Sequence, residues 1–177
     1  STQVVESVFG RLQHGDGISV DQVAPVISSV SKSIDQNPTV FLSVTRLKSK
    51  DEATFLHSIS VSALMILFSR HLGLDETTVQ MLGTAGLLHD VGKLEIPLEI
   101  LNKEGPLDED EIKMIRDHPE KGHAILSRQE GISEIVLDVC LNQHERIDGK
   151  GYPRKLSEAQ VSLHARIAAI CDVYDAI

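Results

Sequence analysis

The segment from Leu87 to Lys93 places a histidine and an aspartate side by side, His89 and Asp90, at the end of an apolar run with helical spacing. Neutral imidazole and carboxylate are side chains that bind divalent first-row metal ions. Adjacent residues at a frayed helix end can both turn toward one ion, and Gly92 can stop the helix there. Such a dipeptide is common by chance, so it predicts a metal site only together with further ligands.

Ligands of the same two kinds lie on four other predicted helices: His57, His118, His144 and Asp172. His57 and Val61 are four residues apart, so His57 faces the apolar side of its helix. A lone histidine on such a face is more often a hydrogen-bonded core residue than a ligand, and both interpretations stay open. Pro119 breaks the next run and leaves His118 at a junction between two helices, which is a suitable place for a ligand.

The carboxylate of Asp172 interrupts an otherwise apolar stretch near the end of the sequence. An aspartate buried without a partner would destabilise the fold by several kcal/mol, so this side chain needs a partner. A metal ion would be one such partner. The alternative is Arg166, which lies on the same predicted helix.

A polar turn follows His144 and runs from Arg146 to Pro153. In it, Gly149 and Gly151 flank Lys150, which brings free backbone N–H groups and a positive charge to one place. This combination suits a phosphate group. The alternative is an ordinary surface turn, for which the Asp-Gly pair alone would be sufficient.

The composition indicates a single helical domain with a substantial core. The chain has 177 residues, 41% of them hydrophobic, and only 3% are aromatic, with no tryptophan. Few aromatic residues argue against a platform that stacks bases of single-stranded nucleic acid. The net charge of −9 would repel a long polyphosphate backbone, so we expect no long nucleic acid as partner. A small anion could still bind at a local positive site.

The location of the protein is predicted from its cysteines and its hydropathy. Cys140 and Cys171 lie inside apolar helical runs and form no closely spaced pair, which favours buried free thiols. Reduced thiols are typical of the cytosol, so we expect a cytoplasmic protein. No stretch approaches the roughly 18 apolar residues of a membrane span, and the N-terminus lacks a signal-peptide pattern.

Apolar spacing and helix-stop signals predict an all-α chain. The expected helices cover 3–13, 20–36, 39–48, 52–71, 75–90, a turn at 98–102, then 108–118, 120 onward, 133–143 and 158–177. Asp75 and Asp108 are expected N-caps. Gly83 and Gly86 each weaken their helix by about 1 kcal/mol relative to alanine, which predicts close packing against another helix. Residues 1–37 are interpreted as an N-terminal helical cap or linker, and residues 38–177 as the main domain.

The motifs together resemble the HD-GYP family, a subset of the HD-superfamily metal phosphohydrolases named for an HD pair and a Gly-Tyr-Pro turn. The resemblance extends from about Asn37 to Ile177. It rests on His57-Ser58, Leu87 to Lys93, Ile96-Pro97, Ile100 to Lys103, His118-Pro119 with Gly122, His144-Glu145, Asp148 to Pro153, and Arg166 to Ala176. So many motifs in the same order make coincidence very unlikely, in contrast to a single motif match.

The resemblance implies an HD-superfamily helical bundle with a metal site at its centre, which hydrolyses cyclic di-GMP to linear pGpG. The implied metals are iron or manganese, with nickel, magnesium or zinc as alternatives. The implied ligands are His57, His89, Asp90, His118, His144 and Asp172, with Asp90 shared between two ions. Asp90 and Lys93 would act in catalysis, and the substrate would contact Lys93, Asp148, Lys150, Gly151, Tyr152 and Pro153. The implied partners are cyclic di-GMP, an upstream regulatory domain and a GGDEF-type protein.

Three departures from the family pattern qualify this expectation. The family usually has two adjacent histidines where this chain has Gln143-His144, and an amide is a poor ligand, so one ion would bind weakly or be lost. Some members carry a glutamate that supports a third ion at the position of Ala53, so we expect two ions at most. The family usually continues beyond Ile177 with a basic segment that holds the substrate, so the C-terminal end is interpreted as truncated.

These departures leave an alternative to the enzyme. In it, the domain is catalytically impaired and acts as a cyclic dinucleotide sensor or a protein-interaction module. A different cyclic dinucleotide substrate, such as a mixed cyclic GMP–AMP, is also open, because no residue in the sequence identifies the base.

Overall fold

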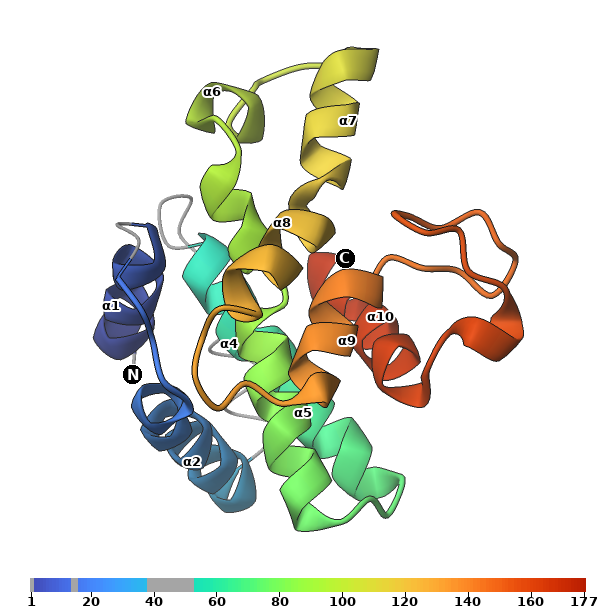
Figure 1. Ribbon diagram of the computed structural model, residues 1–177. Coiled ribbons are helices and arrows are strands. Elements are labelled where there is room, and N and C mark those ends of the chain that lie inside the picture. Colours follow the sequence, from blue (N-terminus) through green and yellow to red (C-terminus); the bar gives the residue numbers. More distant parts are fainter. Residues whose placement is uncertain (1, 14–15, 38–52) are drawn as a thin grey trace.

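The computed structural model describes residues 2–13, 16–37 and 53–177 (Figure 1). Within these ranges every regular element is a helix and no strand is present. The predicted all-α fold is therefore confirmed. The helix predicted over 39–48 lies outside the described residues. No helix in the described ranges has the length and apolar character needed to cross a membrane.

The helices follow the predicted order. Their bounds are α1 Thr2–Gln13, α2 Val20–Gln36, α4 Ala53–His71, α5 Glu76–Leu88, η1 Val91–Glu95, α6 Leu98–Leu101, α7 Glu109–Arg116, α8 His118–Leu126, α9 Glu134–Asn142, η2 Glu158–Gln160 and α10 Leu163–Ala176. The two predicted caps are confirmed, because Asp75 accepts a hydrogen bond from Thr78 N (3.0 Å) and Asp108 accepts one from Glu111 N (2.8 Å). Local capping chemistry therefore sets these helix starts.

The start of the last helix differs from the expectation. It was predicted to cover 158–177, but α10 begins at Leu163. The side chain of Ser162 accepts a hydrogen bond from Ala165 N (3.0 Å) and caps the helix there, while Glu158–Gln160 forms the separate 3-10 turn η2. Serine favours this capping geometry, which explains why the helix starts after the turn rather than before it.

Helices α4 and α5 form the centre of the bundle, with α1 and α2 on one side and α9 and α10 on the other (Figure 1). Their close contact depends on two glycines of α5. A Cβ atom at Gly86 would lie 2.7 Å from Ser62 Cα, and one at Gly83 would lie 2.9 Å from the Ile66 side chain. The predicted close packing is confirmed, and it brings the face of α4 that carries His57 against the end of α5.

The two N-terminal helices share the apolar core of the bundle. Val23 and Ile27 of α2 belong to the same buried cluster as Ile66 and Leu82 of the central helices. On α1, Phe9 meets the ring of a phenylalanine on α4 edge-to-face, with ring centroids 5.6 Å apart. Helices α1 and α2 therefore cover one side of the bundle, and the division at residue 37 stays a prediction.

Gly92 has a different role from the one expected. Helix α5 ends at Leu88, and Gly92 lies within the 3-10 helix η1 without the positive φ of a helix-stopping glycine. A Cβ atom there would overlap the carbonyl oxygen of His118 and lie 2.5 Å from Gly122 N. Gly92 therefore lets η1 contact α8 directly, and this contact brings Asp90 next to His118.

Candidate metal centre

All six residues predicted as metal ligands meet in one cluster. They come from α4 (His57), the end of α5 (His89 and Asp90), the start of α8 (His118), the segment after α9 (His144) and α10 (Asp172). Two groups could each hold an ion, one of His57, His89 and Asp90 and one of Asp90, His118 and His144. Within each group the ligand atoms lie within 4.8 Å of one another, and Asp90 belongs to both.

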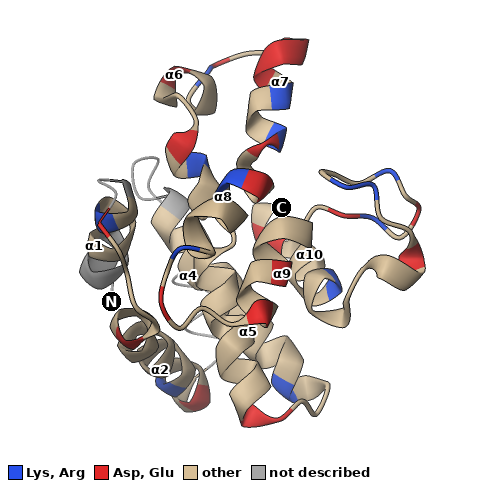
Figure 2. Ribbon diagram, in the orientation of Figure 1, with Lys and Arg blue, Asp and Glu red and all other residues tan. Residues whose placement is uncertain are grey.

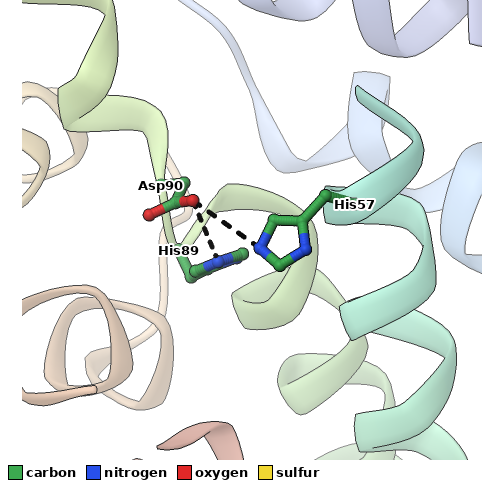
Figure 3. A group of neighbouring side chains, drawn as sticks. All are labelled: His57, His89 and Asp90. Atoms are coloured by element: carbon green, nitrogen blue, oxygen red, sulfur yellow. Dashed lines mark ion pairs between the residues drawn. The ribbon is translucent and has the colours of Figure 1, made fainter. Parts of the chain in front are cut away.

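The first group lies between α4 and the end of α5 (Figure 3). Oδ2 of Asp90 is 3.3 Å from His89 Nε2 and 3.8 Å from His57 Nε2. Asp172 approaches the same two imidazoles, with its Oδ1 atom 3.1 Å from His57 Nε2 and 3.7 Å from His89 Nε2. Two imidazole nitrogens and two carboxylate oxygens therefore face one another, which is a suitable donor set for a divalent ion.

The second group uses the other oxygen of Asp90. Its Oδ1 atom is 3.3 Å from His118 Nε2, which in turn is 3.2 Å from His144 Nε2. Oδ2 of Asp172 lies 4.0 Å from His144 Nδ1. Because Asp90 offers one oxygen to each group, its carboxylate is placed as a bridge between two positions.

Hydrogen bonds behind the histidines fix which nitrogen faces the cluster. His89 Nδ1 lies 2.7 Å from Gly86 O, and His118 Nδ1 lies 2.7 Å from Ile115 O. A carbonyl oxygen can only accept, so Nδ1 carries the proton in both rings and Nε2 is directed at the cluster. Metal-binding histidines are usually held by such an outer hydrogen bond.

Asp172 takes its partners from the cluster and not from Arg166. The Arg166 guanidinium instead donates to the backbone oxygens of Glu158 (2.5 Å) and Val161 (3.0 Å). The alternative that left Asp172 paired with this arginine is therefore wrong. The two residues share a helix, but Arg166 is used to hold the turn in front of α10.

The donor set fits a divalent metal ion. Two buried atoms of the cluster, His89 Nε2 and Asp90 Oδ1, have no hydrogen-bond partner among the described residues. Both residues are almost completely buried, and leaving such polar atoms unsatisfied destabilises a fold. A cation satisfies the imidazole lone pair and the carboxylate oxygen together, and hydrogen bonds between the described side chains do not.

Protons compete with a metal ion for these atoms. Burial alone would lower the pKa of His89, but the nearby charges of Asp90 and Asp172 raise it to about 10. Burial would raise the pKa of Asp90, but His89, His118 and Lys93 bring it well below its ordinary value. The carboxylate of Asp90 therefore stays ionised at neutral pH, and a metal ion competes with a proton for the His89 imidazole.

The remaining predicted catalytic residue, Lys93, lies beside the shared carboxylate. Its Nζ atom is 2.6 Å from Asp90 Oδ2, and about a third of its side chain is exposed (32%). The ammonium group therefore combines contact with the cluster and access to solvent. This position suits a residue that binds an incoming anion.

The turn predicted to hold the substrate has both structural and accessible members. Asp148 pairs with the Arg146 guanidinium (2.6 Å) and accepts a hydrogen bond from Lys150 N (3.0 Å). Gly149 has a positive φ of 72°, and a Cβ atom at Gly151 would overlap the backbone nitrogen of Arg146. The carboxylate of Asp148 is therefore occupied in shaping the turn, and it belongs to neither group of metal ligands.

Tyr152 connects this turn to the cluster. Its ring stacks on His144, with centroids 4.8 Å apart and an interplanar angle of 19°. The peptide bond between Tyr152 and Pro153 is cis. Tyr152 therefore forms a wall beside the second group of ligands.

Gln143 is buried and contacts the backbone behind His89. Its Nε2 atom donates a hydrogen bond to the backbone oxygen of His89 (2.7 Å), and the residue is 1% exposed. The amide thus holds the backbone behind His89. Each group has three histidine or aspartate side chains besides it, and the predicted weakening or loss of one ion at this position stays a prediction.

Two further residues that the sequence interpretation left without a role support the site. Asp175 lies 2.6 Å from His57 Nδ1 and also accepts a hydrogen bond from Ser60 Oγ. It holds His57 as backbone carbonyls hold the rings of His89 and His118. The sequence offered one signal, because Asp172 and Asp175 are three residues apart and so share a face of α10.

Replacing Asp175 by asparagine is expected to weaken metal binding roughly 10- to 100-fold, which is typical of losing an outer-shell partner. The amide has nearly the same shape, but it is a weaker acceptor for the Nδ1 proton of His57. Competition with a chromophoric chelator measures the affinity. The matched control is Asp35→Asn, which changes an exposed carboxylate paired with Arg70. Equal affinities for Asp175→Asn and the wild type would show that Asp175 does not support the ligand.

Glu145 is the second residue that supports the site, and it holds the segment that follows the Gly-Tyr-Pro turn. Its buried carboxylate (4% exposed) accepts backbone N–H groups from Arg154 (2.5 Å) and Leu156 (2.8 Å). Glu145→Gln is expected to lower the free energy of unfolding by about 1–3 kcal/mol, because the amide nitrogen cannot accept and one N–H group stays unsatisfied. Urea denaturation measures this change. A midpoint equal to that of the wild type would contradict the anchoring role.

A family model described as HD domain matches residues 29–177. A cyclic di-GMP phosphodiesterase of Pseudomonas aeruginosa is 45% identical over 98% of this chain and 42% of its own length. A 3'3'-cGAMP-specific phosphodiesterase of Vibrio cholerae is 41% identical over 72% of this chain and 30% of its own length. The chain thus spans less than half the length of these two curated relatives.

A solved structure has the same fold. An HDG"Y"P protein of Bdellovibrio bacteriovorus matches with a TM-score of 0.76 at 22% sequence identity. The match covers 98% of this chain and 56% of that protein. Nearly the whole of this chain therefore has the helical arrangement of a known structure.

Proposed function

Because this chain belongs to the HD domain family, we propose that it is a metal-dependent phosphodiesterase that hydrolyses cyclic di-GMP to linear pGpG. Its predicted place in the HD-GYP family is confirmed. The observation that carries the proposal is the pair of ligand groups joined by Asp90. The similarity to the P. aeruginosa phosphodiesterase supports the choice of substrate.

Two divalent ions are proposed for the two ligand groups, with Asp90 shared between them. Iron or manganese is proposed on the resemblance, with nickel, magnesium and zinc as the alternatives, and a set of four imidazoles and two carboxylates can hold a divalent ion of this kind. When bound, such ions supply Lewis acidity and neutralise the charge that develops on the reacting phosphate. His57, His89 and His118 contribute by presenting Nε2 atoms whose direction is fixed by hydrogen bonds on the far side of each ring.

The chain's own residues bind and orient the substrate. Lys93 is proposed to exchange its contact with Asp90 for one with the scissile phosphate, since its ammonium group already lies at the cluster and is partly exposed. Tyr152 is proposed to line the nucleotide together with its neighbours Gly151 and Pro153, and Lys150 adds positive charge to the turn. Asp148 is proposed to act on the substrate indirectly, through the shape of that turn. An acidic protein can bind a dianion here because local positive charge dominates the field.

A second candidate is favoured by one comparison. The V. cholerae relative is specific for 3'3'-cGAMP, so a mixed cyclic dinucleotide is the alternative substrate. The sensor alternative would need Gln143 to disable the site. Both groups of ligands are present without Gln143, and this favours the enzyme.

The cellular location of the domain and its protein partners are proposed from the resemblance alone. We place it in the cytoplasm, where a second messenger is degraded. An upstream regulatory domain and a GGDEF-type protein are the proposed partners.

The proposed reaction is tested by incubating the protein with cyclic di-GMP and with 3'3'-cGAMP, and by separating the products chromatographically. We expect pGpG from cyclic di-GMP, loss of its formation on chelation, and recovery when manganese or ferrous iron is added. Faster turnover of 3'3'-cGAMP would favour the second candidate. Binding of either nucleotide without any hydrolysis in the metal-loaded protein would contradict the enzyme and favour the sensor.

A further inference from the structure

A positively charged side chain outside the predicted site lies at its rim. Arg116 is the last residue of α7, two positions before His118. Its guanidinium carbon is 5.4 Å from the centroid of the Tyr152 ring. Since Tyr152 stacks on His144, one aromatic ring separates Arg116 from the second group of ligands.

The guanidinium is available to a ligand. Arg116 is exposed, and it forms no ion pair or side-chain hydrogen bond with any residue that the structure describes. An arginine held against the face of an aromatic ring keeps its N–H donors directed outward in one plane, where they can form two parallel hydrogen bonds to a phosphate. The contact with Tyr152 therefore orients Arg116 without using its donors.

The charge distribution makes this position unusual. The chain carries a net charge of −9, and α7 begins with three acidic residues, Glu109, Asp110 and Glu111. Its basic residues, Lys113 and Arg116, lie in the second half of the helix, toward α8 (Figure 2). Of these two, Arg116 is the one that contacts Tyr152 beside the cluster.

We propose that Arg116 binds the second phosphate of the cyclic dinucleotide, the one that is not hydrolysed in the first cut. The inference rests on the proposed function, because only a substrate with two phosphodiester groups requires such a residue. The ligand cluster and Lys93 would bind one phosphate, and the other phosphate lies on the opposite side of the same macrocycle. Arg116 and Tyr152 together offer that side a bidentate donor and an aromatic face.

The test compares Arg116→Ala and Arg116→Lys with the wild type on two substrates. One is cyclic di-GMP, and the other is bis(p-nitrophenyl) phosphate, a diester with a single phosphate. Arg116→Ala is expected to raise KM for cyclic di-GMP roughly 10-fold, with kcat changed by no more than about twofold, because the lost contact exists in both ground and transition states. Arg116→Lys should raise KM less than Arg116→Ala does, because lysine keeps the positive charge but cannot form two parallel hydrogen bonds to the phosphate.

The single-phosphate diester separates binding from support of the fold. Its kinetics should be the same for Arg116→Ala and the wild type. The matched control is Lys113→Ala, which removes an exposed positive charge one turn earlier on α7 and should leave KM for cyclic di-GMP unchanged. Calorimetric binding of a phosphorothioate analogue of cyclic di-GMP adds a measurement that does not depend on turnover. Its affinity should fall roughly 10-fold in Arg116→Ala, with a weaker salt dependence.

Two results would overturn the proposal. One is equal KM and equal analogue affinity in Arg116→Ala and the wild type. The other is an equal loss on both substrates, which would mean that Arg116 only supports the Tyr152 turn. If the wild type binds the analogue but does not hydrolyse cyclic di-GMP, the proposed function fails. The affinities of the two proteins then still decide the role of Arg116.

Discussion

Asp90→Ala is expected to abolish hydrolysis of cyclic di-GMP, with kcat lower by about 1,000-fold or more, since several kcal/mol of charge stabilisation depend on the metal site. Asp90 offers one oxygen to each ligand group, lying 3.3 Å from both His89 Nε2 and His118 Nε2. Its removal therefore affects both proposed ions at once. The metal content per chain should fall together with turnover, as elemental analysis and a product assay on the same sample would show.

The control for this prediction is Asp35→Ala, which removes an exposed carboxylate that pairs with Arg70 and belongs to neither ligand group. It should keep full metal content and turnover. Circular dichroism would show whether Asp90→Ala keeps its helical content, so that loss of the site is distinguished from loss of the fold. Turnover by Asp90→Ala above about a tenth of the wild-type rate would contradict the shared-ligand role.

Gly92→Ala should destabilise the fold by about 3 kcal/mol, near the upper end of what an inserted methyl group usually causes. The new Cβ atom would meet the carbonyl oxygen of His118 and the backbone nitrogen of Gly122. Backbone atoms cannot rotate away as a side chain can, so η1 and α8 must separate. The melting temperature should fall by roughly 6–12 °C for a chain of this size, and turnover should fall because His118 moves away from Asp90.

Gly10→Ala is the matched control, because nothing lies within 4 Å of the Cβ position at this helical glycine. Alanine favours a helix over glycine by up to about 1 kcal/mol, so this variant should melt at the wild-type temperature or slightly above it. Thermal unfolding of both variants and the wild type makes the comparison. A Gly92→Ala protein as stable as the wild type would show that the contact between η1 and α8 is not tight.

Much of the fold could be predicted because its signals are local. The caps at Asp75 and Asp108 depend on residues within three positions, and the apolar period of each helix depends on one or two turns. The HD-GYP resemblance then named six ligands from five separate parts of the chain, and the structure places all six in one cluster. Gly83 and Gly86 predicted close packing correctly, because glycine weakens a helix and so indicates a position where a side chain would not fit.

What could not be predicted depends on contacts between distant parts of the chain. Gly92 was interpreted as a helix stop, because the residues near it in the sequence do not indicate that His118 packs against its backbone. The same holds for Gln143, whose amide binds the backbone oxygen of His89 and so has a role that only packing defines. Arg116 resembles any surface arginine until Tyr152, far along the chain, is placed beside it.

The central claim, two ions joined by Asp90, is tested most directly by elemental analysis of anaerobically purified protein, with cyclic di-GMP hydrolysis measured on the same sample. We predict close to two ions of iron or manganese per chain, together with turnover. One ion or none, with no turnover after manganese or ferrous iron is added back, would contradict the account.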